Sequence, residues 1–133
     1  MDKVIIGWRE WIEIPEWNVK LKAKIDTGAK SSSIDVKDLR REGEQLFFTV
    51  CLSRKRDKDI EVTSTIHRST LVKSSNGISQ ERHFIKLRMI MGGVEKNIEV
   101  SLACRKNMLH RMLLGREALQ NDFLIDSGLD HLT

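Results

Sequence analysis

Hydrophobic and polar residues alternate along much of this chain, as they do in β-strands that turn one face toward a core. The alternation is clearest at 19–25, where four apolar residues are separated by three lysines. The pattern predicts an all-β fold of roughly seven to nine short strands, in a sandwich or a barrel. The other predicted strands, rich in branched and aromatic side chains, cover 4–6, 11–14, 46–52, 60–65, 84–91 and 94–102.

Glycine and polar residues mark the connections between these strands. Gly92 and Gly93 favour a tight hairpin turn, so the strands on either side of them are expected to pair. The polar segment between Thr65 and Phe84 has an Asn-Gly pair near its middle and is predicted to project as a hairpin. One short helix is predicted from about 116 to 121, directly after Gly115, and no tandem repeat is apparent.

Length and composition narrow the class of protein. The 133 residues fit one domain, 1–133, and are too few for two lobes of ordinary size. No apolar run is long enough to cross a bilayer and the N-terminus lacks a secretory apolar segment, so a cytoplasmic protein with no membrane partner is expected. Cys51 and Cys104 lie in unlike contexts and are predicted to be reduced packing residues.

The charge balance suggests the kind of partner. A formal net charge of +4 favours an acidic one. The densest basic cluster, 54–58, is interrupted by an acidic residue, and we interpret it as a solvated hairpin tip. Aromatic residues make up 5% of the chain and include no tyrosine, which leaves few platforms for stacking bases. Nucleic acid is therefore not an expected partner.

The candidate chemistry centres on Asp26, which directly follows the strand 19–25. Activating water to attack an amide needs one ionised carboxylate and a second, protonated carboxyl group that polarises the carbonyl. Gly28 permits a sharp turn and leaves its amide free for the carboxylate, Thr27 can hydrogen-bond across a two-fold axis, and Ala29 is small enough not to crowd a facing subunit. Asp126 also begins an Asp-Ser-Gly sequence, but too few residues follow it to build a second lobe. The partner of Asp26 is therefore expected from another copy of the chain.

Two separated motifs resemble the signature pair of retropepsins. They are Ile-Asp-Thr-Gly-Ala at 25–29, followed by small residues, and Met-Leu-Leu-Gly-Arg at 112–116. The match is closer to a group of small bacterial retropepsin-like endopeptidases, often labelled ATP-dependent zinc proteases. It spans nearly the whole chain and is carried by 6–11, 25–30, 68–82 and 112–119.

This resemblance implies a closed acid-protease barrel with one short C-terminal helix, acting as a homodimeric aspartic endopeptidase. The residues that match the catalytic loop are Asp26, Thr27 and Gly28, and those that would support it from behind are Leu114, Gly115 and Arg116. The residues expected to contact a peptide or protein substrate, in the loop and in a flap-like hairpin, are Ala29, Arg68, Ser74, Ser75, Asn76, Gly77, Glu81 and Arg82. For Arg68, Glu81 and Arg82, a surface ion pair between strands is the equally weighted alternative.

Two other functions stay open. The chain could be a non-catalytic module of the same fold that binds an acidic peptide or polyglutamate tail through Arg68, Arg82 and Arg116. Members of the resembled group are associated with ATP-grasp ligases that append glutamates, which implies a functional link to such a ligase. The label of the group also implies a metal-dependent hydrolase, but the chain has no His-Glu-x-x-His sequence and no Gly-rich phosphate loop. We therefore expect neither a metal nor a cofactor.

Overall fold

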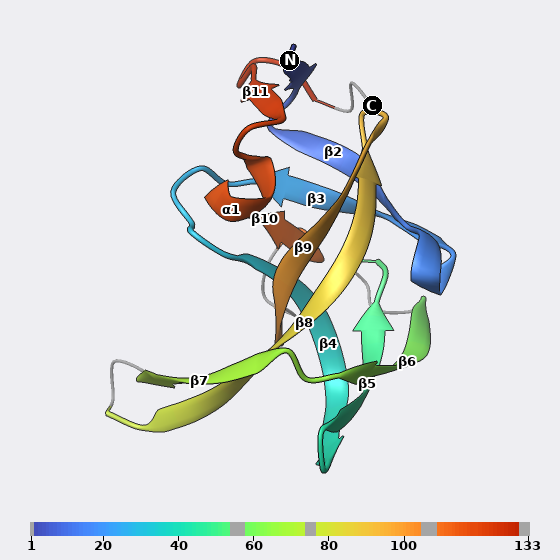
Figure 1. Cartoon of the computed structure of the whole chain (residues 1–133), viewed down its shortest axis with the longest axis vertical. Coiled ribbons are helices and arrows are strands. Elements are labelled where there is room, and N and C mark those ends of the chain that lie inside the picture. Colours follow the sequence, from blue (N-terminus) through green and yellow to red (C-terminus); the bar gives the residue numbers. More distant parts are fainter. Residues whose placement is uncertain (1, 54–57, 74–76, 105–108, 131–133) are drawn as a thin grey trace.

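The computed structural model describes residues 2–53, 58–73, 77–104 and 109–130. Within this part of the chain no helix combines the length and apolar composition that a membrane crossing requires. The 3-10 helix η1 covers Pro15–Trp17 and the α-helix α1 covers Arg116–Leu119. The strands are β1 (Val4–Ile6), β2 (Arg9–Ile14), β3 (Val19–Ile25), β4 (Ser32–Glu42), β5 (Gln45–Cys51), β6 (Asp59–Thr65), β7 (Arg68–Lys73), β8 (Ser79–Met91), β9 (Val94–Ala103), β10 (Met112–Leu114) and β11 (Phe123–Ile125) (Figure 1).

Six of these strands close into a barrel in the order β10, β3, β2, β8, β9, β4. The short strand β10 closes it, because Met112 lies opposite Ala23 of β3 on one side and opposite Ile34 of β4 on the other. Strand β10 runs parallel to β3 and antiparallel to β4, although it comes much later in the sequence. The expected all-β barrel with one short helix is thus confirmed.

The alternation seen in the sequence explains which side chains fill the barrel. In β3, Leu21, Ala23 and Ile25 are buried while the intervening lysines are exposed, as a period of two residues requires. The buried apolar side chains of the barrel strands form one cluster with Ala118, Leu119 and Phe123. The helix α1 therefore covers the end of the barrel at which β3 and β10 finish.

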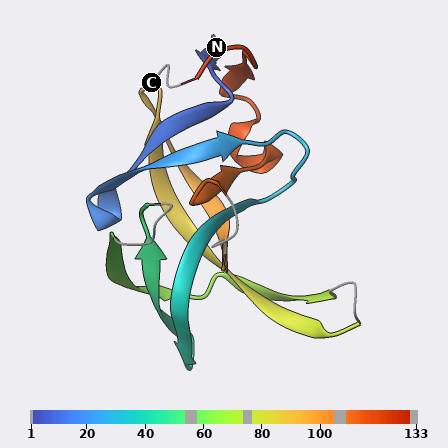
Figure 2. The same ribbon diagram turned by 180° about the vertical axis from the view of Figure 1, so that it is seen from behind.

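Two hairpins extend away from the barrel (Figures 1 and 2). Strands β4 and β5 form one, and β6 pairs with the outer side of β5. Strands β7 and β8 form the other, which confirms the projecting hairpin predicted between 65 and 84. The predicted pairing across Gly92 and Gly93 is also found: both glycines have positive φ, at 60° and 79°, and β8 and β9 pair on either side of them.

Several sequence-based boundaries were wrong for identifiable reasons. Strand β4 was not predicted because its second half is exposed and charged, and β8 begins at Ser79 rather than 84 because its start lies in the polar hairpin. With the short strands β10 and β11, the described residues contain more strands than expected. The helix ends at Leu119 because Gln120 already has an extended backbone, and Asn121 follows with a positive φ of 76°. Cys51 is buried as predicted, whereas Cys104 is exposed.

Replacing Ile34 by Ala should weaken the closure of the barrel. Ile34 is fully buried and lies opposite both Met112 of β10 and Leu102 of β9. Losing its side chain leaves a cavity, and we expect the free energy of unfolding to fall by about 3 kcal/mol in urea titrations. The control Leu71→Ala, in the exposed hairpin, should change it by less than about 0.5 kcal/mol. Equal effects of the two substitutions would contradict this view of the core.

Candidate active site

The loop that follows β3 presents the carboxylate of Asp26. The backbone N–H of Asp26 donates to the carbonyl of Leu114 over 2.9 Å. The N–H of Gly28 donates to Oδ1 of Asp26, also over 2.9 Å. The N–H of Ala29 closes the turn on the carbonyl of Asp26. Asp26 is half-buried, while Thr27 and Gly28 are exposed. One carboxylate oxygen is therefore held by an amide at a site that another molecule can reach.

Residues after β10 hold this loop from behind. A Cβ atom added to Gly115 would lie 2.5 Å from the carbonyl oxygen of Ser31 and 2.8 Å from that of Ala29, so only glycine permits this approach. Arg116 donates from its backbone N–H to the carbonyl of Ala29 and from its guanidinium to that of Thr27, both over 2.8 Å. The predicted supporting residues thus lie against the predicted catalytic loop.

Ser32 completes this support, although the sequence analysis assigned it no role beyond that of a small residue after the loop. The buried N–H of Gly115 donates to Oγ of Ser32 over 3.1 Å. Ser32 is itself buried, and the hydroxyl of Ser101 donates to its carbonyl. A buried amide without a partner is costly, so this hydroxyl stabilises the close approach of β10 to the loop. Its only signal in the sequence is a small hydroxyl residue six positions after the aspartate.

Positive charge surrounds the strand that carries the loop. Lys22 and Lys24 extend from the outer face of β3, and the ammonium of Lys22 lies 5.2 Å from the centre of the Trp11 ring. Burial lowers the pKa of His110 below its ordinary 6.5, and nearby cations, first Arg9 and then Lys24, lower it further. This histidine therefore stays neutral near pH 7. Of these cations, Lys24 lies nearest to Asp26 in the sequence, two residues before it.

The hairpin of β7 and β8 projects on the same side of the barrel as the loop between β3 and β4 (Figures 1 and 2). Gly77 is exposed with a positive φ of 82°. The candidate residues 74–76 lie outside the described part of the chain.

Arg68 anchors the base of this hairpin to the barrel. Its Nε donates to Oε1 of Glu99 in β9 over 2.8 Å, and its guanidinium lies 3.8 Å from the centre of the Phe84 ring. The hydrogen bond from Arg68 lowers the pKa of Glu99, and His67, at 3.2 Å from the same carboxylate, adds to the effect. Arg68, which was predicted to contact the substrate, is thus directed toward Glu99 of β9.

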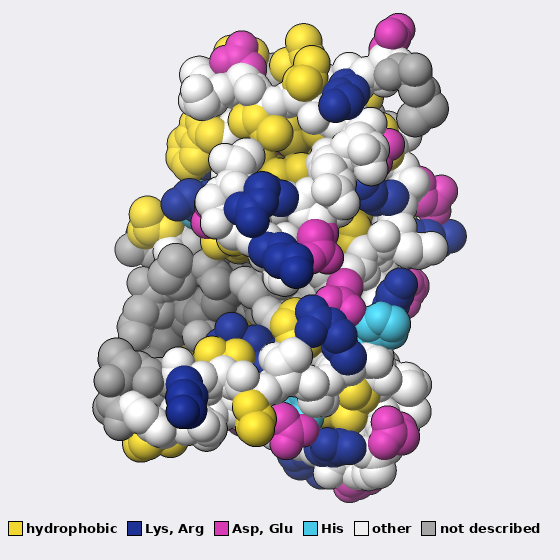
Figure 3. Space-filling view, turned by 60° about the vertical axis from the view of Figure 1, so that its left-hand side comes forward, with side chains coloured by type: hydrophobic (Ala, Val, Ile, Leu, Met, Phe, Trp, Pro, Cys, Tyr) yellow, Lys and Arg dark blue, Asp and Glu magenta, His cyan; other side chains and the backbone are white. Residues whose placement is uncertain are grey.

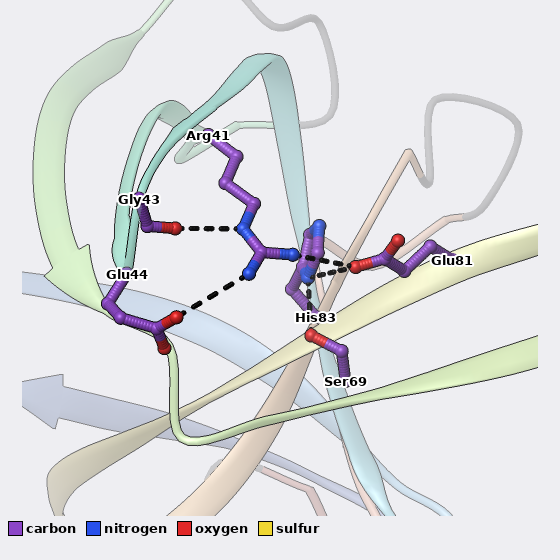
Figure 4. A network of polar contacts seen from close by, with 6 residues as sticks. All are labelled: Arg41, Gly43, Glu44, Ser69, Glu81 and His83. Carbon is purple, nitrogen blue, oxygen red and sulfur yellow. Dashed lines mark hydrogen bonds and ion pairs between the residues drawn. The ribbon is translucent and has the colours of Figure 1, made fainter.

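Glu81 lies in a second network that joins the hairpin to the turn between β4 and β5 (Figure 4). Its Oε1 is 3.0 Å from the guanidinium of Arg41 and 3.5 Å from Nδ1 of His83. The hydroxyl of Ser69 is 2.7 Å from that same Nδ1. A serine triad needs its serine and its acid on different nitrogens of the histidine, so this arrangement fits an anchor rather than a nucleophile. Arg82 is half-buried and lies opposite Thr70.

A protein-family comparison agrees with this geometry. The model described as retropepsin-like aspartic endopeptidase RimB matches residues 5–133. The chain belongs to the RimB-like family. The resemblance drawn from the two sequence motifs is thereby confirmed.

Curated relatives of this RimB-like chain are longer proteins. Probable alpha-L-glutamate ligases of Shewanella pealeana and Desulfotalea psychrophila are 37% and 34% identical to it over 94% and 96% of the chain. In both cases the chain spans only 29% of the relative. A crystal structure of a Legionella pneumophila protein of unknown function superimposes with a TM-score of 0.81 at 26% identity, covering 98% of each chain. Among the described residues, no three His, Cys, Asp or Glu side chains form a group that could hold a metal ion.

The RimB-like chain contains a second loop with the geometry of the first, at the end of β11. The N–H of Asp126 donates to the carbonyl of Ile6 over 2.8 Å, and the N–H of Gly128 donates to Oδ1 of Asp126 over 3.0 Å. The supporting strand is again parallel, since β1 pairs with β11 as β10 pairs with β3. Asp126 is therefore held as Asp26 is.

The glycine after the supporting strand is repeated too. A Cβ atom added to Gly7 would lie 2.1 Å from the carbonyl oxygen of Leu129, and that oxygen accepts the N–H of Trp8 over 2.7 Å. The N–H of Gly7 donates to the buried carboxylate of Glu10, as that of Gly115 donates to a buried hydroxyl. The sequence did not reveal this repeat because the loop precedes its support in one copy and follows it in the other.

Replacing Gly115 by Ala should distort the Asp26 loop. The new methyl group would meet two backbone carbonyls that cannot move without shifting the loop, and we expect a loss of about 2–3 kcal/mol in unfolding free energy. Gly128→Ala is the matched control, because a Cβ there meets only Asp126 Oδ1 at 3.4 Å, an ordinary contact. Similar costs for the two variants in urea titrations would show that the approach at Gly115 is not tight.

Replacing Glu99 by Gln should loosen the base of the β7–β8 hairpin in a pH-dependent way. The pKa of Glu99 is lowered from 4.5, so its pair with Arg68 contributes stability above that pH and loses it as pH falls through the lowered pKa. Both side chains are partly exposed, so we expect Tm to fall by only about 2 °C near pH 7. The difference should vanish in strong acid; a constant difference at all pH values, or one matched by Glu42→Gln, would contradict this role.

Proposed function

We propose that this chain is a cytoplasmic aspartic endopeptidase that works as a homodimer, with Asp26 of each subunit forming the carboxylate pair. The observation that carries the proposal is the loop geometry: the Asp26 carboxylate is accessible and fixed by the amide of Gly28. The loop is in turn fixed by Leu114, Gly115 and Arg116. The description of the family as retropepsin-like aspartic endopeptidases supports the same chemistry.

In this reaction the pair of aspartates supplies both the base and the acid. Two carboxylates that share a site repel each other, so the pair holds one proton. The ionised Asp26 takes a proton from a water molecule, whose oxygen attacks the amide carbon, while the partner's Asp26 gives its proton to the carbonyl oxygen. The C–N bond then breaks as the leaving nitrogen takes the proton held by the first Asp26, and a hydroxyl of the tetrahedral intermediate returns a proton to the partner's Asp26, which restores the pair. Thr27 and Gly28 would brace the pair across the axis.

The hairpin of β7 and β8 would close over an extended peptide lying beside the Asp26 loop. Main-chain hydrogen bonds to the peptide and exclusion of water are what such a cover contributes. Ala29, Gly77 and Arg82 are proposed contacts, together with Ser74, Ser75 and Asn76. Since Arg68 and Glu81 are engaged with Glu99 and Arg41, their contribution would be to hold the hairpin in place.

The exposed surface around the second loop suits contact between subunits. Ile5, Leu124 and Leu129 expose 57%, 53% and 41% of their surface, and hydrophobic side chains gather at the end of the molecule that holds β1 and β11 (Figure 3). Exposed apolar side chains that cluster in this way are typical of interfaces. The pair β1–β11 is therefore our proposed dimer contact.

We infer that the substrate is acidic. Arg116 contacts the Asp26 loop, Lys24 lies two residues before Asp26, Lys22 lies further back on β3, and the chain has a net charge of +4. The curated relatives are named probable alpha-L-glutamate ligases, so a peptide rich in glutamate and a functional link to such a ligase are consistent with this surface. A ligase activity is not proposed for this chain, which spans only 29% of those relatives.

Binding without cleavage is the second candidate, because the same cations would hold an acidic tail whether or not Asp26 pairs. A metal-dependent hydrolase remains the third. Metal analysis of the purified protein, and hydrolysis assays with and without a chelator, would separate the third candidate from the first.

Replacing Asp26 by Asn should abolish peptide hydrolysis while leaving the fold and the dimer unchanged. An amide cannot take the proton from water, so kcat should fall by at least about 10³-fold, near the upper part of what general base catalysis contributes. The measurement is cleavage of fluorogenic peptides between pH 4 and pH 7, with and without a pepstatin-type inhibitor. Wild-type activity should follow a bell-shaped pH profile.

Mixing the two forms tests whether the site is shared. An excess of Asp26→Asn subunits should reduce wild-type activity as mixed dimers form, whereas an excess of Glu42→Gln subunits, which keep the catalytic base, should not reduce it. Full activity of Asp26→Asn, or activity of a strictly monomeric protein, would end the proposal.

Replacing Lys22 and Lys24 by Glu should discriminate against acidic substrates. Reversing two charges near the loop should lower kcat/KM for a glutamate-rich peptide by about tenfold at low salt, with little change for a neutral peptide. The effect should shrink as salt is added, because exposed charges are screened. Arg40→Glu with Lys58→Glu, which also reverses two exposed charges, is the control for a change of net charge alone. Equal losses on both peptides would argue against recognition of acidic chains.

A further inference from the structure

The segment that joins β1 to β2 makes backbone hydrogen bonds to both aspartate loops. The N–H of Trp8 donates over 2.7 Å to the carbonyl of Leu129, whose own N–H closes the turn on Asp126. The carbonyl of Trp8 accepts the N–H of Ile25, the residue directly before Asp26, over 2.8 Å. One residue therefore contacts the loop of Asp126 with its N–H and the end of β3 with its carbonyl.

A buried carboxylate fixes the start of this segment. The N–H of Gly7 donates to Oε2 of Glu10 over 2.7 Å, and Glu10 is fully buried. Glu10 occupies the first inward-facing position of β2, and the next two are taken by Ile12 and Ile14. Burying a carboxylate is costly, and buried charged groups can be replaced by apolar ones of similar volume without loss of stability. What Glu10 offers over a third isoleucine is an acceptor that holds Gly7.

Side chains on the outer face hold the same segment at further points. Arg9 donates from Nε to Oδ2 of Asp130 over 2.9 Å, and its guanidinium lies 4.7 Å from the centre of the Trp8 ring. That ring also meets His110 edge to face, with 6.1 Å between the two ring centres. His110 lies two residues before β10, whose last residue accepts the N–H of Asp26. Trp8 thus contacts the strand that carries Asp26 and the residues that lead into its support.

We propose that Glu10 is a positioning residue for Asp26 and acts through Gly7 and Trp8. Gly7 packs so closely on the carbonyl of Leu129 that an added Cβ atom would lie 2.1 Å from it. A displacement of Gly7 therefore moves the backbone of Trp8 rather than being absorbed locally, and the carbonyl of Trp8 holds the end of β3. The inference rests on the proposed function, in which Asp26 reacts. Misplacing a reacting group by about 1 Å can lower a rate by about a hundredfold.

A role in stability alone makes a different prediction. Glu10→Leu removes the acceptor of Gly7 and puts an apolar side chain of similar size in its place. If Glu10 served only the stability of the fold, the Asp26 loop would respond no more to this change than to a core substitution elsewhere. If Glu10 positions Asp26, the loop moves although the core stays filled.

The direct test follows the amide of Gly28, which donates to the Asp26 carboxylate, in proton–nitrogen correlation NMR spectra of the full chain. Glu10→Leu should shift the signals of both Gly7 and Gly28 by more than their line widths. Glu10→Gln keeps an oxygen that can accept the N–H of Gly7, so it should leave the Gly28 signal near its wild-type position. The spectra require no turnover, so this result does not depend on whether the chain is a peptidase.

Leu46→Val is the matched control for a change in the core. Leu46 is fully buried in β5, at the end of the molecule opposite β11 (Figure 1). Losing one methylene there should lower Tm without moving the Gly28 signal. A folded Glu10→Leu protein with an unmoved Gly28 signal, or an equal shift in Leu46→Val, would overturn the inference.

A surface variant decides the matter if Glu10→Leu does not fold. Arg9→Gln weakens the pair with Asp130 and the contact with the Trp8 ring, and it should shift the Gly28 signal by a smaller amount. Arg88→Gln, which weakens a comparable exposed pair with Glu95, should not shift it. No shift in Arg9→Gln, or the same shift in Arg88→Gln, would then overturn the inference.

Peptide hydrolysis gives a second readout. Glu10→Leu should lower kcat by about 10- to 100-fold and change KM by less than about twofold, because it misplaces a reacting group without touching the peptide. Glu10→Gln should recover most of that loss. A rise in KM at unchanged kcat would contradict a positioning role. A wild-type protein without turnover would instead end the peptidase proposal, and the NMR spectra would still show whether Glu10 positions the loop.

Discussion

The close approach of Gly115 to the loop after Asp26 is the constraint on which the site depends. It brings the backbone of β10 within contact distance of Ser31 and Ala29, where no side chain larger than hydrogen fits. The approach is stabilised by hydrogen bonds rather than by apolar packing alone, since Ser32 accepts the buried amide of Gly115. The carboxylate of Asp26 is thereby positioned by backbone atoms of a closed barrel. Preorganised donors of this kind do not have to rearrange during a reaction.

The same backbone arrangement holds the loop of Asp26 and the loop of Asp126, but the side chains around the two loops differ. Around Asp26 the loop residues Thr27, Gly28 and Ala29 are small, and Arg116 lies against them. Around Asp126 the neighbouring side chains are exposed and apolar, which suits another protein surface. Equal backbone geometry with different side chains gives the two loops different proposed roles.

Much of the fold and of the site could be predicted from the sequence. The alternation in β3 correctly predicted a strand, and the glycine pair at 92–93 correctly predicted a hairpin turn. Both predictions succeed because strand period and turn geometry are local properties of the sequence. The Asp26 loop and its support were found because the two motifs are distinctive. The second half of β4 was missed because exposed, charged strands carry no apolar pattern; its pairing with β5 is a tertiary property. The anchoring of Arg68 by Glu99 depends on a β9 residue 31 positions away, which no local pattern reports.

The position of β10 has a consequence for how the molecule is made. This strand lies between β3 and β4, yet it is synthesised after both, so the barrel cannot close until residues near 114 have left the ribosome. Contacts between such distant parts of a chain form slowly, because a long loop must be ordered first. A growing chain would therefore hold its aspartate in an unbraced loop. If the chain is the peptidase proposed above, this delay would keep it inert until β10 has closed the barrel.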